Sequence, residues 1–246
     1  MDFDDDGYQD LLLVTEDGTA IWTVLLGSSS QRPVFSDWSP DGQWLLYTNQ
    51  SGIFTQLYQI KRDGSDNTYI SRQGYSNNSN GDYSPDSSTI AFERSGTIYT
   101  VLTDGSASAV SIGLTGKWPR WSPDGSALVY YKTDNNLYSA IGGSETQVTN
   151  DGDLQIHPSY IAANQIVYSQ SSGGQYDVYS ADLANIGAAA NLTNTGESDT
   201  YPSLAPGNRI IYLIDNQTIA IMNTDGSGQT TIYSGPRTIT NPRWAP

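Results

Sequence analysis

The stretch of this chain with the most specific chemistry is acidic and N-terminal, DFDDDGYQD. Aspartates occupy positions one, three, five and nine of the stretch, and Gly7 occupies position six. Ca²⁺ takes several hard oxygen ligands, and alternate side chains of a tight loop converge on one ion when a glycine permits the sharp turn. The sequence therefore predicts a calcium site, with the cofactor held by Asp2, Asp4, Asp6, the carbonyl of Tyr8, and Asp10.

Two other interpretations of the acidic stretch are open. An EF-hand would need a glutamate at position twelve, where the chain has Leu13, and the flanking sequence predicts strands and not helices. A solvated acidic tail is the other alternative, because runs of acids are commonly disordered. The register of the alternate aspartates and the glycine favours calcium, and we expect the ion to stabilise the part of the fold that holds it.

Composition excludes several function classes. The 246 residues carry 26 acidic and only 11 basic side chains, for a net charge of −15, which disfavours binding to phosphate backbones. No apolar stretch is long enough to span a bilayer, and the first residues lack the features of a signal peptide. Without cysteine there is no disulfide, thiolate nucleophile or cysteine-based zinc site. We expect a monomer that binds no nucleic acid.

An internal repeat gives the elements that must position any site. Each copy has an aromatic or aliphatic anchor, often followed by Ser-Pro-Asp, and then an apolar strand that ends in an aromatic residue. The anchors are Trp38, Tyr83, Trp121, Tyr160, Leu204 and Trp244. They are separated by 45, 38, 39, 44 and 40 residues. A period of about 40 residues is typical of stacked supersecondary units.

Within each unit, a third strand and a more polar fourth strand follow, joined by turns such as Asp63-Gly64, Asp104-Gly105 and Asp225-Gly226. Four antiparallel strands repeated radially make a β-propeller. A β-sandwich gives no reason for a constant period. The sequence thus predicts an all-β fold, a six-bladed β-propeller of four-stranded antiparallel blades.

The two ends of the chain are predicted to share the sixth blade. NPRWAP, at the C-terminus, would be its innermost strand, and DLLLVTE and TAIWTVLL would pair with it. We therefore expect a single domain over residues 1–246, with a closure blade built from residues 1–30 and 236–246. Pairing the terminal strands would remove two exposed edges.

The W-S-P-D-G motif, the apolar strand after it and the Asp-Gly turn resemble the Pro-Asp repeat of the TolB C-terminal domain, which also occurs in dipeptidyl-peptidase-type propellers and oligogalacturonate lyases. The acidic loop resembles the calcium loops of FG-GAP and VCBS propeller repeats, except that Asp5 stands where a small residue is common. The resemblance implies a periplasmic or extracellular protein.

Residues just before the anchors are candidates for a ligand site, because propellers place function at the central channel. Four of them are charged: Asp37, Asp82, Arg120 and Arg243. Arg243 would neighbour Asp37, and Asp82 would neighbour Arg120. These residues favour structural ion pairs that line the channel, with a ligand site as the alternative.

The channel mouth has further candidates. His157, the only histidine, precedes Pro158, and aromatic residues outside the core register, Trp118, Tyr201, Tyr75 and Phe35, would form a binding rim. Catalysis has little support, since a triad needs an activated serine and no G-x-S-x-G motif is present. We expect a non-catalytic binding or scaffold module for a protein partner or glycan at the channel face. The alternative is a polysaccharide-active lyase or glycoside hydrolase, or a lectin-like accessory domain.

Overall fold

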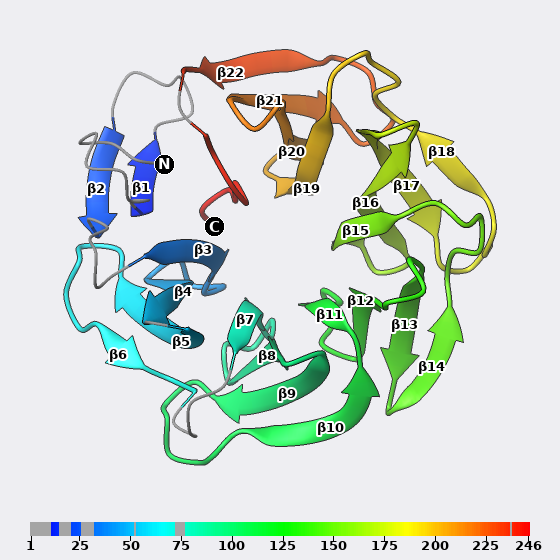
Figure 1. Ribbon diagram of the computed structural model, residues 1–246. Helices are drawn as coiled ribbons and strands as arrows, with labels where there is room; N and C mark the ends of the chain where they lie inside the picture. The colour runs from blue at the N-terminus through cyan, green and yellow to red at the C-terminus, as the bar shows by residue number, and fades with distance from the viewer. Residues whose placement is uncertain (1–10, 15–20, 26–31, 52, 72–76, 237) are drawn as a thin grey trace. The chain divides into compact units, whose positions relative to one another are not determined.

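The structure is a computed structural model that describes residues 11–14, 21–25, 32–51, 53–71, 77–236 and 238–246. The described residues form an all-β propeller of four-stranded antiparallel blades (Figure 1). The chain divides into two compact units, Met1–Thr115 with Ala245–Pro246, and Gly116–Trp244. The described part of the chain contains no helix with the length and hydropathy of a transmembrane segment.

The first unit holds a two-stranded sheet and two blades. The two-stranded sheet pairs β1 (Leu11–Val14) with β2 (Ile21–Leu25). Blade 1 consists of β3 (Pro33–Trp38), β4 (Trp44–Ser51), β5 (Phe54–Lys61) and β6 (Thr68–Tyr69). Blade 2 consists of β7 (Asn78–Tyr83), β8 (Thr89–Arg94), β9 (Thr97–Leu102) and β10 (Val110–Thr115).

The second unit holds three blades, again with neighbouring strands adjacent in sequence. Blade 3 consists of β11 (Lys117–Trp121), β12 (Ala127–Tyr131), β13 (Leu137–Ile141) and β14 (Ser144–Gln147). Blade 4 consists of β15 (Gln155–Ala162), β16 (Gln165–Ser172), β17 (Gln175–Asp182) and β18 (Ala189–Asn191). Blade 5 consists of β19 (Asp199–Ala205), β20 (Arg209–Ile214), β21 (Thr218–Asn223) and β22 (Thr230–Ser234).

The prediction of six blades is wrong, because the described residues form five four-stranded blades. NPRWAP forms no strand, and residues 238–246 are not part of any sheet. The prolines do not explain this difference, because the aligned Pro119, Pro158 and Pro202 lie within β11, β15 and β19. Among the described residues, no strand pairs with this segment. The N-terminal strands β1 and β2 pair with each other in a separate sheet.

Both ends of the chain nevertheless reach blade 1. Val24 of β2 and Ala245 pack against a buried cluster formed by Trp38, Leu45, Tyr47 and Ile60. Strand β2 and the C-terminal segment therefore contact this blade by apolar packing and, among the described residues, not through a shared four-stranded sheet.

The blades are built as the repeat predicts, with one exception. The middle residues of each second strand are buried, as in β12 and β20, and they include a buried aromatic residue that pairs with the third strand. Tyr47 stacks on Tyr58 at 5.5 Å, and Tyr168 stacks on Tyr179 at 5.9 Å. Such cross-strand aromatic pairs stabilise a sheet. The exception is the anchor Leu204, whose side chain is 43% exposed.

The Ser-Pro-Asp motif forms the turn between the first and second strands. In blade 3, Asp124 accepts hydrogen bonds from the hydroxyl of Ser122 (2.6 Å) and the amide of Ser126 (3.0 Å). Gly125 has a φ of 71°, which an L side chain rarely adopts. The same bonds recur at Asp41 and Asp86. The motif is therefore structural, because its aspartate satisfies the backbone of a tight turn.

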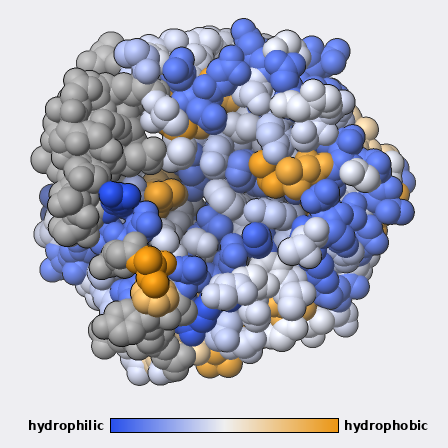
Figure 2. Space-filling model, viewed as in Figure 1, coloured by the Kyte–Doolittle hydropathy of each residue, from blue (hydrophilic) through white to orange (hydrophobic). Residues whose placement is uncertain are grey.

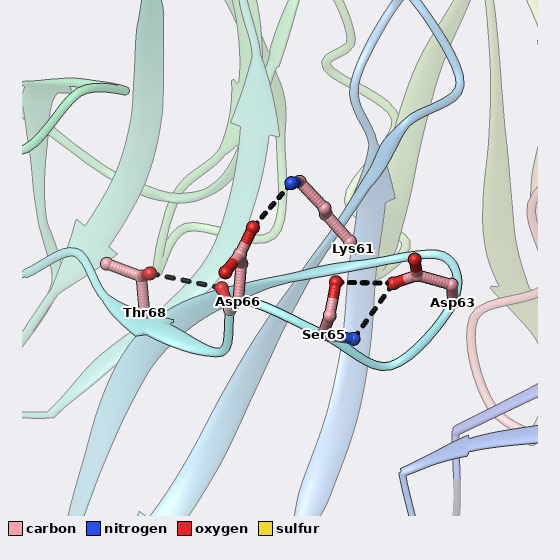
Figure 3. Close-up of polar contacts among 5 residues, drawn as sticks. All are labelled: Lys61, Asp63, Ser65, Asp66 and Thr68. Atoms are coloured by element: carbon pink, nitrogen blue, oxygen red, sulfur yellow. Dashed lines mark hydrogen bonds and ion pairs between the residues drawn. The ribbon is translucent and has the colours of Figure 1, made fainter.

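The predicted Asp-Gly turn between β5 and β6 is confirmed (Figure 3). Asp63 accepts hydrogen bonds from the amide and the hydroxyl of Ser65, at 2.9 and 2.6 Å. Lys61 forms an ion pair with Asp66, and Thr68 donates to the carbonyl of Asp66 at 3.1 Å. These contacts lie on the surface and fix the start of the outermost strand.

Candidate functional site

Three aromatic side chains meet in the second unit, and we call Trp118, His157 and Tyr201 the aromatic cluster. They come from β11, β15 and β19, the first strands of three successive blades, and β15 lies beside both of the others (Figure 1). The ring centroids of His157 and Tyr201 are 3.8 Å apart with planes inclined by 14°. Trp118 lies 4.5 Å from His157 and 5.8 Å from Tyr201. All three rings are half-buried.

A repeated backbone irregularity places these rings. Each strand has a register shift at the aromatic residue, and each of the three residues has a left-handed φ, of 58° at Trp118, 54° at His157 and 53° at Tyr201. Bulky residues rarely adopt this conformation, and β-bulges redirect a side chain. The same conformation occurs at Asn80 in β7 and at Asn241. The first strands of blades 2 to 5 thus share one left-handed position, which an aromatic ring fills in blades 3 to 5.

The cluster carries positive charge beside the rings. The guanidinium of Arg120 lies 5.5 Å from the centroid of the Trp118 ring, and its Nη1 donates to the carbonyl of Pro119 at 3.0 Å. Burial, followed by the charges of Arg243 and Arg120, lowers the pKa of His157 to about 3. His157 is therefore neutral at physiological pH.

This environment is suited to binding more than to proton transfer. An efficient general base has a pKa near the working pH, and the pKa of His157 is far below it. Within the described residues, the buried Nδ1 of His157 and Nε1 of Trp118 have no hydrogen-bond partner. Half-buried rings next to arginines offer π faces and cationic groups, which recognise apolar, planar or anionic groups.

The other predicted channel residues have structural contacts. Asp37 on β3 is half-buried, and its Oδ2 accepts a hydrogen bond from the amide of Tyr83 at 3.0 Å. Asp82 on β7 is buried. The predicted pairs of Asp37 with Arg243 and of Asp82 with Arg120 join different units, and they stay predictions.

The remaining predicted site residues are placed as follows. Phe35 packs edge-on against Trp38 at 6.2 Å, so it belongs to the surroundings of the blade 1 core. Tyr75 and the whole predicted calcium loop, Asp2, Asp4, Asp6, Tyr8 and Asp10, lie outside the described residues. Among the residues that the structure does describe, no group of three or more histidines and acids is arranged as a metal site.

Sequence reasoning did not find that Trp118, His157 and Tyr201 share one backbone conformation. The three rings do occupy one position of the repeat, each before a proline: WPRW, HPSY and YPSL. A proline favours an extended conformation in the residue before it, so this pattern predicts the alignment of the rings but not their left-handed φ.

Comparisons with known proteins identify the fold. No protein-family model and no curated protein matches the chain. A solved structure described as TolB of Agrobacterium tumefaciens superposes with a TM-score of 0.75 and 21% identity, over 92% of this chain and 90% of that one. TolB of Acinetobacter baumannii gives a TM-score of 0.74 and 22% identity, over 94% of this chain and 60% of that one. An oligogalacturonate lyase in complex with manganese gives 0.64 and 13%, over 93% and 73%.

Proposed function

From its TolB-like β-propeller fold, we propose that this chain is a non-catalytic binding module that recognises a protein partner through the aromatic cluster. The observation that carries the proposal is the aromatic cluster itself. Three half-buried rings from three blades meet in one place, on backbone positions that are conformationally costly. Strained positions of this kind concentrate at ligand clamps and active sites, where the surrounding structure holds them.

A protein partner fits the chemistry of the cluster better than a glycan. Tryptophan, tyrosine and arginine dominate the binding energy at protein interfaces, and the cluster combines Trp118, Tyr201 and Arg120. Glycan binding and polysaccharide cleavage, in line with the lyase similarity, are outcomes that the experiment below separates.

Selection of peptides from a phage-displayed random library tests the proposal. The immobilised chain is the bait, and the affinity of each selected peptide is measured for the wild type, for Tyr201→Ala and for Tyr176→Ala, a half-buried tyrosine outside the cluster. Thermal melts establish that each variant is folded. We expect Tyr201→Ala to weaken binding by about tenfold or more, as loss of an aromatic anchor does, and Tyr176→Ala to leave it unchanged.

Equal binding by all three proteins would contradict a site at the aromatic cluster. A glycan array and an assay for lyase and hydrolase turnover on polysaccharides are run in parallel. Binding or turnover that depends on His157 or Tyr201, with no peptide selected, would replace the protein-binding proposal by one of the polysaccharide-based alternatives.

Three further parts of the proposal come from the sequence. Calcium would be bound by the N-terminal acidic loop, the chain would act in a periplasmic or extracellular setting, and it would be a monomer. The TolB-like fold is compatible with each of them. Calorimetric titration with calcium, cell fractionation and analytical ultracentrifugation test them separately.

A further inference from the structure

The connections between blades share a buried hydrogen-bonding arrangement. In the connection from β6 to β7, the hydroxyl of Ser71 accepts from the amide of Leu57 (3.1 Å) and from the side chain of Asn78 (3.1 Å). In the connection from β14 to β15, the hydroxyl of Thr149 accepts from the amide of Leu137 (2.9 Å) and donates to Gln155 (2.8 Å). In both, a hydroxyl links the third strand of one blade to the first residue of the next.

The connection from β18 to β19 has a carboxylate where the others have an amide. Thr193 accepts from the amide of Val178 at 3.0 Å, as Ser71 and Thr149 do for their own third strands. The first residue of the next blade is here Asp199, which is 0% exposed, as are Asn78 and Gln155.

The residue opposite Asp199 gives it no polar partner across the ladder. Asn78 pairs with Arg94, whose Nε donates to Asn78 at 2.7 Å, and Gln155 pairs with Gln170. Asp199 pairs with Ile214 of β20. Because opposite residues of an antiparallel pair share a face, the carboxylate lies against an aliphatic side chain.

Few hydrogen bonds compensate for this burial. Oδ2 of Asp199 accepts from the hydroxyl of Thr195 at 2.9 Å, and the hydroxyl of Thr193 gives the carboxyl a second, weaker contact. The hydroxyl of Thr193 donates to Asp177 of β17 at 3.3 Å. A buried charged group that is incompletely hydrogen-bonded is costly, and loss of the charge relieves the cost.

The charged and titratable neighbours add to this effect. Burial raises the pKa of Asp199 to about 6, the hydroxyls of Thr195 and Thr193 lower it, and the charges of Asp177 and Glu197 raise it. Tyr212 of β20 is buried nearby, and its own pKa is raised to about 12, mainly by burial and also by Asp199 and Glu197. Asp215, after β20, accepts from the amide of Ser198 at 2.9 Å. None of these neighbours is a basic residue.

From this geometry we infer that protonation of Asp199 keeps segment 192–198, which joins blade 4 to blade 5, in its closed conformation. We call Asp199 the latch. The neutral carboxyl is accommodated in the buried position opposite Ile214 and keeps the hydrogen bond from Thr195. The ionised carboxylate favours an open segment in which water solvates it. The latch is independent of the proposed function, but it lies on β19 two residues before Tyr201, so opening would disturb the aromatic cluster.

Hydrogen exchange tests the latch directly. The amides of Tyr176 and Val178 donate to Ser198 and Thr193, at 3.2 and 3.0 Å, so their protection reports closure of the segment. We expect their protection factors, corrected for intrinsic exchange rates, to fall by about tenfold or more from pH 5 to pH 7.5. The isosteric variant Asp199→Asn, which cannot ionise, should show no such change. An equal change in this variant would overturn the inference.

Two further variants keep the test decisive. Ile214→Gln places a polar residue opposite Asp199, as Gln170 stands opposite Gln155 in blade 4. This variant should lower the pH at which Asp199 titrates in carboxyl ¹³C NMR. An unchanged midpoint would contradict a role of Ile214 in the titration. Gln155→Glu places a carboxylate in the equivalent position of the preceding connection, beside Asp151. In this variant, hydrogen exchange at the amide of Leu137 should become pH-dependent. If it does not, burial of a carboxylate at this position is not what causes the pH dependence.

Discussion

The imidazole of His157 lies flat against the phenol ring of Tyr201, although the two residues belong to different blades and are 44 positions apart in the sequence. The contact exists because both strands contain a bulge with a left-handed residue at the same point. Burial, and after it the charges of Arg243 and Arg120, make a protonated imidazole unfavourable. The pair is thus a neutral, apolar surface next to fixed positive charge.

The titration of His157 is the first prediction. Its folded pKa of about 3 lies below the ordinary value of 6.5, so the neutral form stabilises the fold above pH 6.5, and this contribution is lost as the pH falls toward 3. As the only histidine, it gives a single imidazole signal in proton NMR. We expect no titration of that signal between pH 5 and 8. A midpoint near 6.5 would show that the imidazole is solvated. His157→Gln should remove part of the acid sensitivity of the melting temperature.

Gly116, just before β11, provides a test of packing against β12. A Cβ at this position would overlap the ring of Tyr130, which is fully buried, and lie 3.1 Å from the carbonyl oxygen of Tyr131. Neither group can move freely, so Gly116→Ala should destabilise the fold by about 1–3 kcal/mol in chemical denaturation. Gly196→Ala is the matched control, because a Cβ there meets nothing within 4 Å. Equal effects of the two substitutions would contradict the packing described for Tyr130.

Protonation of Asp124 at acid pH should destabilise the fold through the Ser-Pro-Asp turn. Hydrogen bonds from Ser122 and Ser126 lower its pKa to about 2, from an ordinary value of 3.8. Its stabilising contribution is therefore present above pH 4 and lost as the pH falls toward 2. Asp124→Ala should lower the melting temperature at pH 7, and the difference from the wild type should shrink at low pH. A difference that is constant with pH would mean that the charge has no part in the turn.

Calcium binding is predicted from the sequence alone. Saturating calcium should raise the melting temperature above that in EDTA, because a ligand that binds only the folded state adds stability, by on the order of 3 kcal/mol at a hundredfold excess over Kd. The double substitution Asp4→Asn and Asp6→Asn should abolish the difference. Identical melts of the wild type in calcium and EDTA would contradict a metal site in the acidic loop.

The sequence predicted the repeating unit well, because the signals for it are local. The Ser-Pro-Asp turn, the apolar second strand and the Asp-Gly turn each follow from a few neighbouring residues, and β3, β7, β11, β15 and β19 lie where the anchors placed them. Trp38, Tyr83 and Tyr160 are buried as expected. Of the predicted site residues, Trp118, His157 and Tyr201 do come together, with Arg120 beside them.

The errors and omissions concern long-range relations. Counting Trp244 as a sixth anchor took a match of sequence as evidence for a strand, although the repeat pattern does not show whether another strand pairs with NPRWAP. The exposure of Leu204 could not be read from its position in the repeat. The sequence does not single out Asp199, because isolated acidic residues are common in this acidic chain. Its significance appears only when the register shows Ile214 opposite it.

The recurring bulge has a constant backbone conformation and a variable side chain. The left-handed residue is an asparagine in β7 (Asn80) and an aromatic residue in β11 and β19 (Trp118 and Tyr201). Under the proposed function, exchanging the side chain at this point in the repeats that contain the bulge would alter recognition while leaving the hydrogen-bonded sheets intact. Evolution, or a protein engineer, could vary the specificity of such a chain one repeat at a time.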